Sequence, residues 1–205
     1  MKKLLLFAFV LTAFVTTSFR LAPGTLSADE RKFAIDYYQK TKDRLIKDLE
    51  GLSEAQLNFK ADPTRWSIYQ CTEHIALAEN MIWQWIQMTE KQPATPEKRS
   101  EVKVTLDQLM KGTLDRTQKF KAPEMLQPEA KFPDTRAAFQ AYQARRDSTI
   151  EYIRTTQDDL KDHFITHPAA GTMDLYQALV MLAAHSERHT MQIEEVKADP
   201  NFPKH

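Results

Sequence analysis

The sequence has little cysteine and no net charge, and each shortage excludes a class of protein. Cys71 is the only cysteine among the 205 residues, so the chain cannot close an internal disulfide. Its stability must come from side-chain packing or from a bound metal ion, and we expect Cys71 to be a small core residue. The 28 basic and 28 acidic side chains balance, so there is no positive excess to follow a phosphate backbone. We therefore expect no nucleic-acid partner.

Glycine is also scarce, with four residues in the whole chain. Leucine, alanine, glutamate, glutamine and lysine are abundant instead, and these residues have high helix propensity. Turn-rich sheet proteins use glycine and β-branched residues heavily, which this chain does not. The composition therefore predicts an all-α protein.

The chain has one long hydrophobic run, at residues 4–15, which follows two lysines and precedes the small residues 16–18. This order is typical of a secretory signal peptide. The run is shorter than the roughly 20 apolar residues that span a bilayer, which disfavours a membrane anchor. We expect residues 1–18 to be a signal peptide, and residues 19–205 to form a single exported domain, periplasmic or secreted, with no stable membrane span after cleavage.

Four long segments carry the hydrophobic periodicity of helices. They are residues 28–49, 67–89, 135–156 and 174–197. Ser67 and Gln70 are spaced as a capping box, in which each side chain accepts from an otherwise unpaired backbone N–H of the first turn. Asp134 or Thr135 can cap the third segment in a similar way. These signals fix where two of the helices are expected to begin.

A shorter and more polar helix is expected over residues 105–119, although Gly112 lies inside it. The other connections, including residues 51–66 and 158–173, are expected to be loops, because no strand pattern is present in them. Long helices joined by connections of several residues predict a four-helix bundle with an extra short helix. Sites in such bundles are built from side chains that project inward from facing helices.

The last predicted helix contains "AAHSERHTMQIEEV", which places His185 and His189 on one face. Residues four apart differ by about 40° around a helix, and their β-carbons lie on the order of 6 Å apart. Both imidazoles can therefore reach one ion, and Gln192 falls on the same side. Glu187 projects roughly 160° away from His189, so it cannot serve as the general base of an HExxH zinc protease. That enzyme class is excluded by both the order and the geometry of the residues.

A histidine pair alone leaves two interpretations open, a metal site or a pair that is merely hydrogen bonded or solvated. The apolar neighbours of His185 favour the metal site, because burying imidazoles without partners costs free energy. His74 lies on the second predicted helix, in "WSIYQCTEHIALAE", among mostly apolar residues. Three histidines would match the number of protein ligands in a catalytic metal site that keeps one position open. Spacing alone does not settle whether His74 meets the pair.

Together, "RWSIYQCTEHIALAE" and "LAAHSERHTMQIEEV" resemble the two signature helices of the DinB-like superfamily of bacterial helical bundles. The resemblance extends over essentially all of residues 19–205. It implies an up-down-down-up bundle with a long crossover that holds the extra short helix. It also implies a divalent ion, most often zinc or nickel, with His74, His185 and His189 as its ligands.

The resemblance leaves the reaction open. It implies a metal-dependent hydrolase or a thiol-dependent S-transferase acting on an unnamed small molecule, or a bundle that binds a metal or small ligand without turnover. Export disfavours the transferase, because the thiols used by such relatives are cytosolic, so we favour a hydrolase. Relatives with this fold often dimerise, which makes a homodimer plausible.

Other polar and aromatic residues carry weaker hypotheses. His163 and His167 are expected to be solvated in a loop, although His167 could border a pocket. Tyr69 and Tyr176 are candidates to line a cavity, with core packing as the default.

Overall fold

The computed structural model describes residues 24–204. The segment predicted as a signal peptide, residues 1–18, lies outside these residues. No helix in the described part of the chain is long and apolar enough to cross a membrane.

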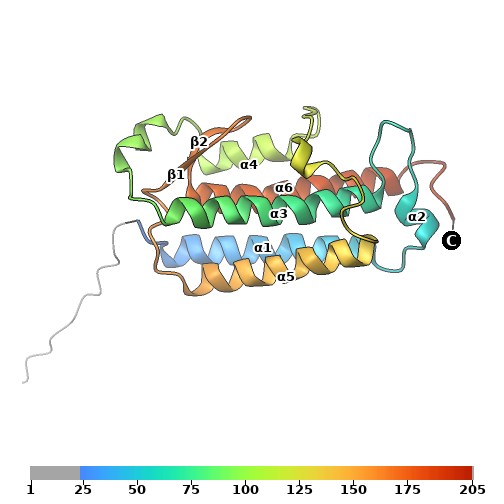
Figure 1. The fold of residues 1–205 in the computed structure, drawn as a ribbon, viewed down its shortest axis with the longest axis horizontal. Helices are drawn as coiled ribbons and strands as arrows, with labels where there is room; N and C mark the ends of the chain where they lie inside the picture. The colour runs from blue at the N-terminus through green and yellow to red at the C-terminus, as the bar shows by residue number, and fades with distance from the viewer. Residues whose placement is uncertain (1–23, 205) are drawn as a thin grey trace, which may run out of the picture.

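Four long helices form the body of the molecule: α1 (Ala28–Leu49), α3 (Ile68–Glu90), α5 (Thr135–Thr155) and α6 (Leu175–Lys197). α3 packs against α5 and α6, and α1 packs against the same two helices, so the four close into a ring. α1 and α6 run in one direction and α3 and α5 in the other (Figure 1). The predicted up-down-down-up four-helix bundle is confirmed.

Each long helix begins at a side chain that accepts a backbone N–H of the first turn. Ser67 and Gln70 form the predicted capping box of α3, and Asp134 accepts from the backbone of Ala137 at the start of α5. Asp174 and Gln177 form a further capping box at the start of α6. Replacing such a cap typically costs about 1 kcal/mol, so these short polar signals help to set where each helix starts.

The long crossover between α3 and α5 contains the 3₁₀ helix η1 (Pro96–Glu101), the helix α4 (Leu106–Leu114) and the 3₁₀ helix η2 (Glu124–Leu126). α4 lies outside the ring and packs along α6 (Figure 1). The extra helix was predicted to reach residue 119, but it ends at Leu114. There the Asp115 side chain accepts the backbone N–H of Thr117 at 2.9 Å and turns the chain. Arg188 of α6 donates to the carbonyls of Thr113 and Asp115, which satisfies the end of the helix.

Besides the two 3₁₀ helices, an α-helix and a β-hairpin occur in described segments that the sequence predicted to be loops. A five-residue helix, α2 (Glu54–Asn58), begins at a capping box of Ser53 and Gln56. An antiparallel hairpin, β1 (Phe164–His167) with β2 (Gly171–Asp174), leads into α6. Its strands have four residues each and are too short to produce a clear alternating pattern, so the prediction of no strands was wrong.

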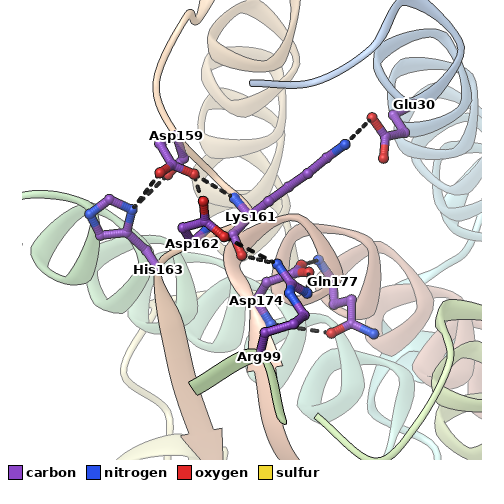
Figure 2. Close-up of polar contacts among 8 residues, drawn as sticks. All are labelled: Glu30, Arg99, Asp159, Lys161, Asp162, His163, Asp174 and Gln177. Atoms are coloured by element: carbon purple, nitrogen blue, oxygen red, sulfur yellow. Dashed lines mark hydrogen bonds and ion pairs between the residues drawn. The ribbon is translucent and has the colours of Figure 1, made fainter. Parts of the chain in front are cut away.

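The start of α6 is fixed by a network of charged side chains (Figure 2). Arg99 donates to Asp174 at 2.6 Å and to the carbonyl of Lys161, and Lys161 pairs with Glu30 at 2.7 Å. His163 is buried rather than solvated, which corrects the prediction, and its ring nitrogens contact the carbonyls of Asp159 and Gln92. This network ties the hairpin and the crossover to α6 and so sets the position of that helix along the bundle.

α6 is the most deeply buried helix, with neighbours on every side. α1 and α3 cover its inner faces and α4 covers its outer face. A helix surrounded in this way can be apolar all round, which accounts for the run "LYQALVMLAA".

The bundle core also contains an ion pair with no exposure to solvent. Arg146 of α5 pairs with Glu79 of α3, and both side chains are fully buried. Ser186 of α6 donates to Glu79 at 2.8 Å and accepts from Arg146 at 2.6 Å. The guanidinium lies over the rings of Tyr38 and Tyr142, 4.3 and 5.1 Å from their centroids. All four long helices therefore meet around one charge.

Candidate metal centre

His74, His185 and His189 come together between α3 and α6, an arrangement that the spacing of the residues alone left open. One ligand-capable nitrogen from each ring lies within 4.8 Å of the other two. His74 and His189 are buried, with 3% and 8% exposure, and His185 is partly buried. The ring centroids are 4.5 to 5.1 Å apart, so the three imidazoles face a common point. We call these three residues the histidine triad.

Hydrogen bonds to the outer ring nitrogens select the tautomers of two triad members. Nδ1 of His74 donates to the carbonyl of Leu126, the last residue of η2, at 2.8 Å. Nδ1 of His189 donates to Oε1 of Gln192 at 2.9 Å. Because each proton is held on Nδ1, the lone pair of each ring lies on Nε2, which faces the triad centre. This is the way in which metal-ligating histidines are normally oriented.

The spacing within the triad fits a tetrahedral metal ion. Two nitrogens bound to one zinc ion at about 2.0–2.1 Å lie roughly 3.3–3.4 Å apart. The Nε2 atoms of His74 and His185 are 3.4 Å apart. Nδ1 of His185 is buried without a hydrogen-bond partner among the described residues. Nε2 of His74 presents its lone pair to Nε2 of His185, so the two atoms share either a proton or a cation, and the donor set suits a divalent ion.

Burial keeps the triad neutral, which is the form that binds metals. Desolvation lowers the pKa of His74 and lowers the pKa of His185 and His189 further. The neighbouring imidazoles add to the shift in His185 and His189, because each would repel a second positive charge. Unprotonated imidazoles can bind an ion without first releasing protons.

The surroundings of the triad come from connections between the long helices. Trp66, just before α3, lies over His74 and His189, with ring centroids 4.8 and 5.9 Å away. On the crossover, the backbone N–H groups of Ala130 and Lys131 donate to Glu73, the neighbour of His74. These contacts hold the crossover against α3 close to the site.

A second layer of contacts supports His189. Arg116 donates to Oε1 of Gln192 at 3.4 Å, and its Nε and second terminal nitrogen donate to Glu195 at 3.0 and 2.7 Å. Gln192 therefore accepts from both His189 and Arg116 through one oxygen. This arrangement fixes the amide so that it cannot turn its NH₂ group toward the ring.

The triad lies in the wall of a large cavity of about 1580 Å³ between α3, α4, α6, the hairpin and the crossover. His167 also lines this cavity, so it borders a pocket as the sequence allowed. Tyr69 and Tyr176 do not line it and instead donate to the carbonyls of Phe132 and Glu30. Cys71 is fully buried in the core, as predicted.

Glu187 is directed away from the triad, as the helical geometry predicted. Its carboxylate accepts from Tyr37 at 2.7 Å and from Arg44 at 2.9 Å, both on α1. The residue therefore joins α6 to α1 and is not available as a base at the triad.

Comparison with known proteins identifies the family. A model of the DinB superfamily matches residues 37–193, which is well over half of the chain. The chain belongs to the DinB superfamily. Uncharacterized protein YuaE from Bacillus subtilis (strain 168) is 24% identical over 151 residues, which cover 73% of this chain and 88% of YuaE.

A solved structure with a similar fold is that of YfiT from Bacillus subtilis, described as "a probable metal-dependent hydrolase with an unusual four-helix bundle topology". It superimposes with a TM-score of 0.57 at 16% identity, over 86% of this chain and 90% of YfiT. At that identity the likeness establishes a shared fold. The DinB assignment made from the two signature helices is confirmed.

Several residues around the triad of this DinB-superfamily protein were not predicted from the sequence. Leu126 and Arg116 lie on the crossover, and no periodic pattern links them to α3 or α6. Gln192 was placed on the correct face, but its bond to His189 depends on side-chain orientation that spacing does not give. Local sequence patterns do not predict which residues of a long irregular connection contact a site.

Proposed function

We propose that this protein is a metal-dependent hydrolase in which His74, His185 and His189 hold a divalent ion, zinc or nickel, beside the cavity. The observation that carries the proposal is the 3.4 Å separation of two Nε2 atoms within a group of three neutral imidazoles that are buried or partly buried. When bound, such an ion would supply Lewis-acid chemistry for hydrolysis at an open coordination position. YfiT, which shares the fold and is described as "a probable metal-dependent hydrolase", supports the same assignment.

In this proposal, residues around the triad orient its histidines and shield them from water. Gln192 keeps the proton of His189 on Nδ1, and Trp66 shields two of the rings from water. The two carboxylates that line the cavity, Asp115 and Glu195, already accept hydrogen bonds from Thr117 and Arg116. We therefore assign neither of them as a general base.

Metal binding is expected to be stoichiometric and stabilising. The protein, expressed without a polyhistidine tag and stripped of metal, should bind one equivalent of Zn²⁺ or Ni²⁺ in a calorimetric titration. At a free ion concentration of 100 times Kd, linkage adds about 2.7 kcal/mol to the free energy of unfolding. For a domain of this size that raises Tm by roughly 5–10 °C.

The matched control for this titration is His167→Ala, which removes a cavity histidine outside the triad. It should bind the same equivalent with unchanged affinity. Loss of the equivalent in this variant, or no binding by the unmodified protein, would count against the triad as the site.

Hydrolysis is tested separately from binding. The metal-loaded protein is assayed against a panel of carboxylic esters, amides and phosphoesters, with and without a chelator. Chelator-sensitive turnover supports the hydrolase. Metal binding without turnover of any of them favours a sequestering bundle, and turnover only when a low-molecular-weight thiol is added favours the S-transferase.

Gln192→Leu should weaken metal binding about 10- to 100-fold, the usual cost of removing a hydrogen-bond partner from a ligating histidine. The change leaves Nδ1 of His189 without its acceptor, so the ring can turn and change tautomer. Competition with a chromophoric chelator measures the affinity. Gln84→Ala, an exposed glutamine of the same cavity, is the control and should leave Kd unchanged. Equal affinities for Gln192→Leu and the unmodified protein would show that the hydrogen bond does not position His189.

Export through residues 1–18 and assembly into a homodimer stay predictions from the sequence. N-terminal sequencing of the mature protein and its mass in solution test them.

A further inference from the structure

The mouth of the cavity that contains the triad is unusually apolar. Among residues 24–204, four large hydrophobic side chains are exposed, and three of them, Met88, Phe120 and Met125, line this cavity. Their exposures are 60%, 66% and 65%. Inside the cavity the apolar lining continues with Met81, Trp85 and other side chains. Exposed apolar groups that gather at one opening are characteristic of a ligand-binding site.

The same mouth carries free positive charge. Lys119 and Lys121 lie on either side of Phe120 and line the cavity, and neither side chain has a partner in the described part of the chain. The other charged residues that line the cavity are Arg65, Asp115, Arg116, Arg188 and Glu195. The basic side chains therefore outnumber the two carboxylates, and the crossover adds two cations that no internal group neutralises.

The remaining charges are already used within the protein. Arg188 donates to three backbone carbonyls and lies over the Phe120 ring at 5.9 Å. Glu195 pairs with Arg116 at 2.7 Å and with Arg65 at 3.9 Å. Lys119 and Lys121 are thus the cations available to a ligand. Their position beside exposed Phe120 places a charge at the entrance and apolar surface further in.

We propose that the cavity binds an amphipathic anion, a small molecule with an apolar chain or ring and a carboxylate or phosphate group. The apolar part lies against the methionine and aromatic side chains, and the anion pairs with Lys119 and Lys121 at the mouth. The identification of this molecule as the substrate class rests on the proposed hydrolase function, whereas its binding does not require the metal. A concave cavity of about 1580 Å³ can enclose a small molecule, whereas it offers little contact to a flat membrane surface.

Octanoate and octyl phosphate are suitable probes, with octanol and octyltrimethylammonium as neutral and cationic analogues of the same chain length. Titration by calorimetry uses the full protein, first as purified and then after metal removal. Both anions should bind at least tenfold more tightly than the cation. The anion with the higher affinity identifies the preferred head group, carboxylate or phosphate. In the series butanoate, hexanoate, octanoate, affinity should rise by up to about fourfold per methylene as each is buried.

The variant Lys119→Gln with Lys121→Gln should weaken octanoate binding about fivefold and leave octanol binding unchanged. The matched control, Lys91→Gln with Lys98→Gln, removes two exposed lysines outside the cavity and should change neither. Phe120→Ser should weaken the binding of both octanoate and octanol. Metal-free protein should still bind octanoate, so failure of the metal site and failure of this proposal give different results.

Three outcomes would overturn the proposal. The first is equal binding of octanoate and octyltrimethylammonium. The second is an equal loss of octanoate affinity in the control pair of lysine variants. The third is binding to anionic phospholipid vesicles without binding to monomeric octanoate or octyl phosphate, which would assign the mouth to a membrane surface.

Discussion

Replacing His185 with alanine is expected to lower the affinity for Zn²⁺ or Ni²⁺ by at least about 100-fold. Nε2 of His185 lies 3.4 Å from Nε2 of His74, and loss of this ring leaves two imidazoles to hold an ion that three hold well. His74→Ala and His189→Ala should have effects of similar size. Competition against a chelator of known affinity measures each Kd.

The fold of these variants is checked by far-UV circular dichroism and by the Tm of the metal-free proteins, which should stay close to that of the unmodified chain. A full equivalent of metal retained at unchanged Kd in one variant would remove that histidine from the ligand set. The same experiment on Met181→Ala, a neighbour on α6 that lines the cavity without a nitrogen donor, controls for altered packing.

Replacing Arg146 with methionine is expected to destabilise the protein by about 3–5 kcal/mol, the usual cost of leaving one buried charge without its partner. Glu79 would lose its cation in a position with no exposure to solvent, and Ser186 would lose a donor. Denaturant unfolding measures the change. Arg154→Met on the same helix is the control, because its ion pair with Glu151 is exposed, and it should cost less than about 0.5 kcal/mol.

The pH dependence separates an unpaired charge from a simple packing defect. Burial raises the pKa of Glu79, and Arg146 opposes that shift. Without the arginine, the folded state holds a proton that the unfolded carboxyl loses near its ordinary pKa of about 4.3. The stability of Arg146→Met should therefore fall as pH rises above that value.

The double variant Glu79→Leu with Arg146→Met should recover most of the lost stability, because no charge is left unpaired. A pH-independent loss in the single variant, with no recovery in the double variant, would assign the effect to packing.

The four long helices could be predicted because their signals are local. Ser67 with Gln70 and Asp134 mark two starts within one turn of chain, and the periodic apolar residues continue for five or six turns. α2 was missed even though Ser53 and Gln56 form the same capping pair, because one turn of helix is too short to show periodicity. The hairpin was missed for the corresponding reason, since strands of four residues leave little room for alternation.

The triad was predictable in part. The spacing of His185 and His189 places them on one face of any helix, but the meeting with His74 depends on how α3 packs against α6. The residues around His74 made it a candidate ligand, and the family resemblance assigned it to the same site as the pair. The cavity could not be derived, because much of its wall comes from the crossover and the hairpin, which lie far apart in the sequence and have no regular pattern.

The histidines lie on long helices, whereas part of the cavity lining lies on the connections between them. The triad stands on α3 and α6, whereas Phe120, Met125 and His167 belong to the crossover and the hairpin. Connections of this kind accept insertions and replacements far more readily than packed helices do. Substitutions in these two segments are therefore expected to change the lining of the cavity without changing the positions of the three histidines.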